Sequence, residues 1–254
     1  EPLLAAVRFT GATVTRVRRR VDEGFRLHPD DVAAALTPAT KMVVMTNLHN
    51  PTSGLSSEAD LIAIGGHARA VGARVLVDEV YLDAVEGTRT SALIGPEFVV
   101  TSSLTKVYGL SGLRAGWVIA EPELAERMWR FNDLLGVNQA HQAERLACFA
   151  FAHLDRITAG NAERLAENRA LFDAFVASRD GLSCMASTHG PTAFPRWRGG
   201  DTRALDDRLR DRFDTGVVPG HWFEMPDRFR VGLSGNTDRL REALDRLGAC
   251  LDSF

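Results

Sequence analysis

The chain has 254 residues, of which 45% are hydrophobic, and this is enough to bury the core of one large domain or two modest ones. With 25% charged residues, the composition is that of a globular protein and excludes a disordered chain. The net charge of -3 argues against a nucleic-acid partner, and no apolar run reaches the ~18–20 residues that span a bilayer. Three widely spaced cysteines (Cys148, Cys184 and Cys250) fit neither a disulfide framework nor a metal cluster, so we expect no metal and a cytoplasmic location.

Lysine is rare in this chain. Of 30 basic residues, only Lys41 and Lys106 are lysines, and the others are arginines. An arginine stays protonated in proteins, whereas a lysine can lose its proton and become a nucleophilic amine. If the chemistry of this protein needs an amine, two residues are candidates.

The first 150 residues alternate between short β-rich runs and helical patterns, which predicts an α/β fold. The basic run 16–20 fits a solvated strand or sheet edge. Continuous runs of Val, Ile and Leu, without strict alternation, favour a mostly parallel sheet with helices on both faces. The strands predicted from these runs are 43–46, 74–77, 98–101 and 115–119.

The helices are predicted from their start and stop signals. Ser57 is the expected N-cap of an amphipathic helix that ends near Gly72, and Pro122 begins a second helix. A long charged helix is expected over 154–176, and a last one after Asn236. We predict a large domain over 1–160, incomplete at its N-terminus, and a smaller C-terminal α+β domain over 161–254.

Three polar clusters follow predicted strands, at the strand ends where open α/β sheets bind ligands. They are 49–54 (His-Asn-Pro-Thr-Ser-Gly), 78–81 (Asp-Glu-Val-Tyr) and 103–106 (Ser-Leu-Thr-Lys), the last followed by a Gly-rich stretch with Arg114. Each has a simpler explanation: a turn, a structural ion pair and a surface lysine, respectively. The surface explanation is weakest for Lys106, because the surface of this protein is otherwise built with arginine.

Together the clusters supply what pyridoxal phosphate (PLP) needs from a protein. An amine forms a Schiff base with an aldehyde, and a carboxylate keeps a pyridine nitrogen protonated. A phenol donates a hydrogen bond to a phenolate oxygen, while a hydroxyl and a guanidinium bind a phosphate.

The third cluster extends to a longer pattern: Ser103-Leu104-Thr105-Lys106, Gly109-Leu110, Gly112 and Arg114-Ala115-Gly116. In this pattern the chain resembles the fold-type I PLP enzymes, specifically the class I/II aminotransferases related to aspartate aminotransferase. The Asn-Pro-Thr and Asp-x-x-Tyr clusters precede it in the order of that family. The resemblance covers essentially the whole chain.

The resemblance implies a role for each matching residue. Lys106 is expected to bind PLP as an aldimine and to move the substrate proton, and Asp78 to pair with the pyridine nitrogen. Tyr81 and Asn50 are expected to donate hydrogen bonds to the ring oxygen, with Asn50 also near the substrate. The phosphate is expected to contact Ser103 and Arg114, and more weakly Thr105.

An amino-acid substrate carries an α-carboxylate, which a bidentate arginine binds best. In the family this arginine precedes the last helix. Arg230, which begins an Arg-Val-Gly-Leu-Ser run, is the match, and Arg228 is the alternative on the same strand face.

The chain departs from the family pattern in three places. The loop 50–54 has one residue more than the usual Asn-Pro-Thr-Gly, and Leu48 stands where proline is frequent. The family's N-terminal part, with its phosphate-binding loop, ring-stacking aromatic and dimer contacts, is expected before Glu1. We therefore expect the chain by itself to bind PLP weakly or not at all.

The leading hypothesis is a PLP-dependent aminotransferase, a homodimer by resemblance, that moves an amino group between an amino acid and a 2-oxo acid. The stretch 137–141 has no arginine, which weakly disfavours strict aspartate specificity. One alternative is a lyase or decarboxylase with the same cofactor and fold. Another is an aminotransferase-like effector domain of a transcription regulator.

Overall fold

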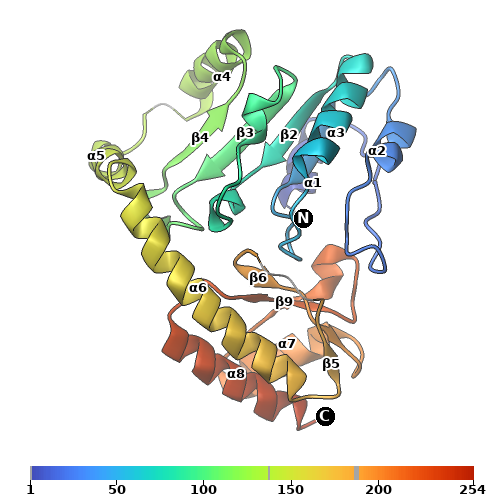
Figure 1. Cartoon of the computed structure of the whole chain (residues 1–254), viewed down its shortest axis with the longest axis vertical. Helices are drawn as coiled ribbons and strands as arrows, with labels where there is room; N and C mark the ends of the chain where they lie inside the picture. The colour runs from blue at the N-terminus through green and yellow to red at the C-terminus, as the bar shows by residue number, and fades with distance from the viewer. Residues whose placement is uncertain (1, 137, 186–188) are drawn as a thin grey trace. The chain divides into compact units, whose positions relative to one another are not determined.

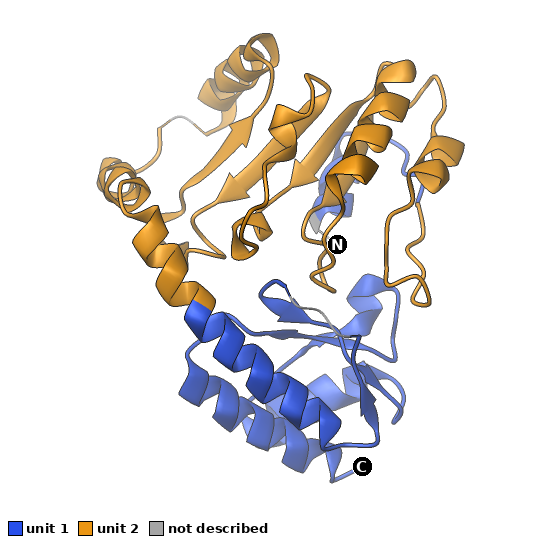
Figure 2. Ribbon diagram, in the orientation of Figure 1, with its two compact units in different colours: residues 1–16, 163–254 blue, residues 17–162 orange. Residues whose placement is uncertain are grey.

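A computed structural model of the chain describes residues 2–136, 138–185 and 189–254, and it divides into two compact units (Figure 2). Residues 17–162 form the sheet unit; residues 1–16 and 163–254 form the terminal unit. The predicted domain boundary near residue 160 stays a prediction. The division into units falls two residues later and assigns residues 1–16 to the terminal unit, where Arg16 forms an ion pair of 3.0 Å with Glu224.

The sheet unit contains four strands in the order β1-β2-β3-β4 (Figure 1). β1, β2 and β3 are parallel, and β4 runs antiparallel to β3, which confirms the predicted α/β class with a mostly parallel sheet. The strands are β1 (Met42–Thr46), β2 (Arg74–Asp78), β3 (Phe98–Ser103) and β4 (Gly116–Ile119), each within two residues of its prediction. The basic run 16–20, expected as a strand or edge, has no regular structure, and this part of the expectation was wrong.

Helices lie before, between and after the strands of the sheet unit. The helices are α2 (Pro29–Ala35), α3 (Glu58–Ala70), α4 (Pro122–Leu135), α5 (His141–Phe151) and the start of α6 (Leu154–Ala177), with short 3-10 turns η1 (Leu82–Ala84), η2 (Ser91–Leu93) and η3 (Ser111–Leu113). Ser57 is the N-cap of α3, as predicted, and its hydroxyl accepts a hydrogen bond of 3.1 Å from the N–H of Asp60.

α3 packs against β2, with α2 beside it. Along β2 the side chains alternate, so that Val75 and Val77 are fully buried in the core beneath α3 and Asp78 points to the other face of the sheet. On that other face Met42, Val44 and Val118 remain exposed.

The terminal unit has its own core. Its elements are α1 (Pro2–Phe9), the rest of α6, β5 (Leu182–Ser183), β6 (Thr192–Ala193), β7 (Arg196–Trp197), α7 (Thr202–Phe213), β8 (Val218–Pro219), η4 (Gly220–Phe223), β9 (Phe229–Gly232) and α8 (Thr237–Leu251). The last helix confirms its prediction: Asn236 is the N-cap, and Leu240, Leu244 and Leu247 are buried against α7 and β9. None of the helices in the described parts of the chain has the length and apolar character needed to span a bilayer.

Two neighbouring glycines of α3 test how tightly this helix packs on the sheet. A Cβ at Gly65 would lie 2.6 Å from Cε2 of Phe98, which is 1% exposed, whereas a Cβ at Gly66 would meet nothing within 4 Å. Gly66→Ala is expected to raise the free energy of unfolding by about 0.5–1 kcal/mol through helix propensity. Gly65→Ala is expected to lower it by about 1–2 kcal/mol, because overpacking outweighs that gain. Urea unfolding of both variants measures the difference, and equal effects would contradict this packing.

Candidate active site

A row of three polar side chains crosses the carboxyl end of the parallel strands. Thr46 of β1 is in register with Asp78 of β2, and Asp78 is in register with Thr101 of β3. Paired residues of adjacent strands project to the same face of the sheet, here the face opposite α3. The backbone fixes this row, since the N–H of Glu79 donates to the carbonyl of Thr101 at 2.8 Å.

Asp78 is a half-buried carboxylate with few partners. Its Oδ1 accepts a hydrogen bond of 3.2 Å from the N–H of Val80. Burial raises the pKa of Asp78, while the N–H of Val80, the hydroxyl of Thr101 and the ammonium of Lys106 oppose the rise in that order. Asp78 and Lys106, assigned to one site from the sequence, therefore lie close enough to interact electrostatically.

The Asn50 loop follows β1 and is tied to the end of β2. The N–H of Asn47 donates to the carbonyl of Asp78 at 2.9 Å, and the Oδ1 of Asn47 accepts from the N–H of Ser56 at 3.0 Å, which closes the loop. The N–H of Asn50 donates to Oγ1 of Thr46 at 3.0 Å. Asn50 is thus attached by its backbone to the same row of residues that contains Asp78.

His49 supports this loop as a neutral imidazole. Its Nδ1 lies 2.8 Å from Oγ1 of Thr52, which also accepts the N–H of Gly54 at 3.3 Å. Thr52 thus joins the imidazole to the backbone at the end of the loop. Burial, with a smaller effect of the Arg19 guanidinium, lowers the pKa of His49 to about 3.

The segment before α2 packs beside His49. The ring of Phe25 lies 6.2 Å from the imidazole, and Arg19 donates to the carbonyl of Phe25 at 3.1 Å. Burial lowers the pKa of Arg19 to about 10.

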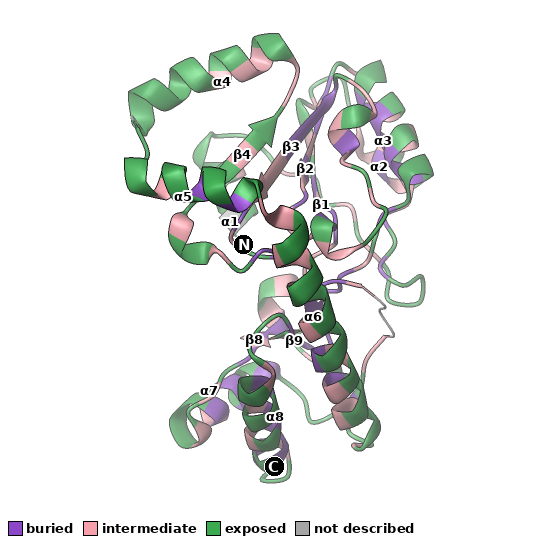
Figure 3. Ribbon diagram, turned by 60° about the vertical axis from the view of Figure 1, so that its left-hand side comes forward, coloured by how far each residue is buried: buried purple, intermediate pink, exposed green. Residues whose placement is uncertain are grey.

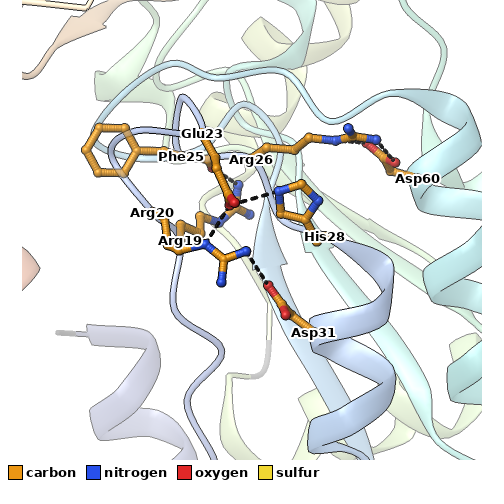
Figure 4. A network of polar contacts seen from close by, with 8 residues as sticks. All are labelled: Arg19, Arg20, Glu23, Phe25, Arg26, His28, Asp31 and Asp60. Carbon is orange, nitrogen blue, oxygen red and sulfur yellow. Dashed lines mark hydrogen bonds and ion pairs between the residues drawn. The ribbon is translucent and has the colours of Figure 1, made fainter.

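Ion pairs attach the same segment to both helices on this side of the sheet (Figure 4). Arg26 binds both carboxylate oxygens of Asp60 in α3, at 2.7 and 3.1 Å. Arg20 contacts Glu23 at 2.7 Å and Asp31 of α2 at 3.6 Å. These pairs account for the order of a segment without regular structure, and through Phe25 they extend to the Asn50 loop.

Lys106 lies in a turn after β3, where its side chain is exposed. The turn is closed by hydrogen bonds from the N–H of Gly109 to the carbonyl of Lys106 at 3.1 Å and from Leu110 to Leu104 at 3.0 Å. The hydroxyls of Ser103 and Thr105, just before the lysine, form a hydrogen bond of 2.6 Å with each other.

Arg114 is exposed at the end of η3, in the left-handed region with φ of 54°. Its guanidinium donates to the carbonyl of Ser111 at 3.3 Å. Tyr81 precedes η1 and is half-buried. The other tyrosine, Tyr108, donates from its hydroxyl to Asp83 at 2.7 Å, so this phenol has a carboxylate partner within the fold.

The two arginines considered for a substrate carboxylate differ in their surroundings. Arg228 is buried, donates to the carbonyl of Phe194 at 3.0 Å and has a pKa lowered by burial, which is the environment of a structural residue. Arg230, half-buried on β9, has its guanidinium 5.5 Å from the ring of Phe223. Arg230 belongs to the terminal unit, and every other predicted site residue belongs to the sheet unit.

Sequence reasoning missed two residues of the site, Thr46 and Thr101. Both are polar residues at the ends of apolar strand runs. This was the sequence signal that could have indicated a position near the site. Their importance depends on the register that pairs them with Asp78. Val137, the first residue of the arginine-free stretch, lies outside the described residues; 138–141 lead into and begin α5.

Comparisons with known proteins decide the family. The sequence model for aminotransferase class I and II matches residues 3–247. The chain belongs to this family. Capreomycidine synthase of Streptomyces vinaceus is 30% identical over 242 residues, which is 92% of this chain and 61% of that relative. Arginine–pyruvate transaminase AruH of Pseudomonas aeruginosa is 28% identical over 250 residues, 94% of this chain and 63% of that relative.

The fold agrees with that of a solved structure. A PLP-dependent aminotransferase from Streptococcus suis matches with a TM-score of 0.90 and 24% identity, over 97% of this chain and 67% of that one. The chain spans about three fifths of the length of the two curated relatives. Membership in the family implies PLP as the cofactor, as the sequence predicted.

The donor set at the sheet edge fits PLP. Asp78 offers a half-buried carboxylate, which suits a protonated pyridine nitrogen. Lys106 offers an exposed amine nearby, and the Ser103–Thr105 pair offers two hydroxyls that suit a phosphate. Among the described residues, no group of three or more His, Cys, Asp or Glu side chains is placed to bind a metal ion.

Burial of Asp78 predicts a pH-dependent change in stability. Because its pKa is raised in the folded chain, the ionised form disfavours folding above the unfolded pKa of about 3.9. Asp78→Asn is therefore expected to raise the free energy of unfolding of the cofactor-free protein at pH 7. The gain should vanish below about pH 4, where Asp78 is protonated in both states. Urea unfolding across this pH range measures it, with exposed Asp133→Asn as the control. A variant no more stable than the parent at pH 7 would contradict the burial argument.

Proposed function

We propose that this protein is a PLP-dependent aminotransferase that moves an amino group between an amino acid and a 2-oxo acid. The observation that carries the proposal is the position of Asp78, half-buried at the end of β2 and close enough to Lys106, in the turn after β3, for the ammonium to favour the ionised carboxylate. Membership in aminotransferase class I and II supports it, and so does the transaminase named among the relatives.

The residues have distinct tasks in this proposal. Asp78 accepts a hydrogen bond from the ring nitrogen and keeps that nitrogen protonated. PLP, when bound, supplies an electron sink for the bond broken at the substrate α-carbon. Lys106 binds the cofactor through Nζ and moves the α-proton of the substrate.

Other side chains orient the cofactor and the substrate. Tyr81 and Asn50 donate hydrogen bonds to the ring oxygen, and Asn50 also contacts the substrate. Arg230 binds the substrate carboxylate with two parallel N–H donors. The phosphate is bound by the hydroxyls of Ser103 and Thr105 and by the guanidinium of Arg114, because charge-assisted hydrogen bonds to phosphate are strong.

We also propose a homodimer. None of the residues of α4 is buried, and its exposed side chains include Trp129, Phe131, Leu134 and Leu135 (Figure 3). Exposed apolar patches of this kind mark interaction sites. Sedimentation equilibrium that finds only the monomer mass at micromolar concentration would refute this part. The cytoplasmic location that we propose is supported by three free thiols, Cys148, Cys184 and Cys250.

The two lysines of the chain allow a matched test of the cofactor site. In the full-length gene product with PLP, Lys106→Ala is expected to abolish the absorbance band of lysine-bound cofactor and to lower transamination by about 10²–10⁴-fold or more. Lys41→Ala should leave both unchanged. Borohydride reduction and peptide mass mapping should find the cofactor mass on the peptide containing Lys106. The cofactor mass on Lys41 instead would refute the assignment.

The reaction type is tested by the fate of the cofactor. With a panel of amino acids and no 2-oxo acid, an aminotransferase converts its PLP to pyridoxamine phosphate in one turnover, and a 2-oxo acid then restores PLP. A lyase or decarboxylase releases ammonia or CO₂ and leaves PLP unchanged. Release of ammonia or CO₂ without formation of pyridoxamine phosphate would refute the aminotransferase proposal in favour of a lyase or decarboxylase. One of the relatives is named as a synthase, which makes this measurement worthwhile.

A further inference from the structure

Thr101 lies on β3, at the residue paired with Asp78 of the neighbouring strand β2. The two residues are paired in the parallel ladder of β2 and β3, and side chains at paired positions stand on the same face of the sheet. Neighbouring strands are about 4.8 Å apart, so a threonine hydroxyl on β3 is within reach of a carboxylate on β2.

The backbone leaves this pair little freedom. The N–H of Glu79 donates to the carbonyl of Thr101 at 2.8 Å, and the N–H of Asn47 donates to the carbonyl of Asp78 at 2.9 Å. The strand that presents Asp78 is therefore fixed on both sides, by β3 and by the Asn50 loop. The N–H of Val80 donates to Oδ1 of this carboxylate at 3.2 Å.

Burial disfavours the ionised carboxylate, and few groups of the described chain oppose it. They are the N–H of Val80, the hydroxyl of Thr101 and, as the charged group facing it, Lys106. In the proposed function Lys106 Nζ is engaged by the cofactor, which leaves Val80 and Thr101 as the neighbours that favour the anion. Thr101 is the first polar residue of β3, after Phe98-Val99-Val100.

We propose that Thr101 is a positioning residue for the cofactor: its hydroxyl, at the residue paired with Asp78 in the parallel ladder, orients the Asp78 carboxylate towards the ring nitrogen of PLP. This inference rests on the proposed function. Thr101 acts through Asp78 and touches neither the substrate nor the reacting atoms.

The test uses near-isosteric variants of Thr101 in the full-length gene product. Thr101→Val keeps the β-branched shape that suits a strand and removes the hydroxyl, and Thr101→Ser restores the hydroxyl. Ser102→Ala is the matched control, because Ser102 is next in the strand and projects to the opposite face. Matching far-UV circular dichroism spectra of the variants and the parent would establish that the fold is kept.

Two measurements separate positioning from a structural role. The dissociation constant for PLP, from equilibrium dialysis, is expected to rise about tenfold in Thr101→Val, as for the loss of one hydrogen bond to a charged group. It should return to the parent value in Thr101→Ser and stay there in Ser102→Ala. In the cofactor-free protein, carboxyl NMR is expected to find the pKa of Asp78 higher in Thr101→Val than in the parent.

Failure of this inference is distinguishable from failure of the proposed function. If the parent binds PLP and Lys106→Ala does not form the lysine-bound band, the function stands. Unchanged PLP affinity and unchanged Asp78 titration in Thr101→Val would then overturn the role of Thr101 alone. If the parent protein does not bind PLP, both proposals fall.

Discussion

The site depends on one physical constraint: a carboxylate at the end of a buried parallel strand must find compensation for its charge. Asp78 follows Val75 and Val77, which are fully buried beneath α3, and the alternation of the strand turns it to the opposite face. Burial raises its pKa, and the described chain supplies only partial compensation. A protonated heterocycle would add to this compensation. The half-buried carboxylate therefore lowers the stability of the cofactor-free protein, and in the proposed function it provides a contact for the cofactor.

The remaining elements fix the surroundings of this carboxylate. Asn47 joins the Asn50 loop to the backbone of Asp78, and Thr46 accepts the N–H of Asn50. Farther out, Phe25 packs beside His49, and the Arg26–Asp60 ion pair attaches the Phe25 segment to α3. The Asn50 loop has no regular structure, and these specific contacts hold its backbone in place. This order matters because a hydrogen-bond donor on a loop is useful only where its backbone has a defined position.

The sequence predicted the strands, the capped helices and the polar clusters well, since these follow from local patterns. Ser57 and Asn236 are N-caps as expected, and the four strands lie where the apolar runs are. Register is a different kind of information, because it depends on pairing between segments more than 20 residues apart. For this reason Thr101 was invisible as a neighbour of Asp78. The helix α7, rich in charged residues, was also missed.

The charge of Lys106 explains why the site needs more than an acid and an amine. While its amine is free, the ammonium helps to keep Asp78 ionised. In the proposed function the proton on the ring nitrogen of PLP would be a second counter-charge to Asp78. The hydroxyl of Thr101 and the N–H of Val80 would favour the ionised carboxylate with or without the cofactor, because these donors are neutral and their dipoles do not change with the state of the lysine.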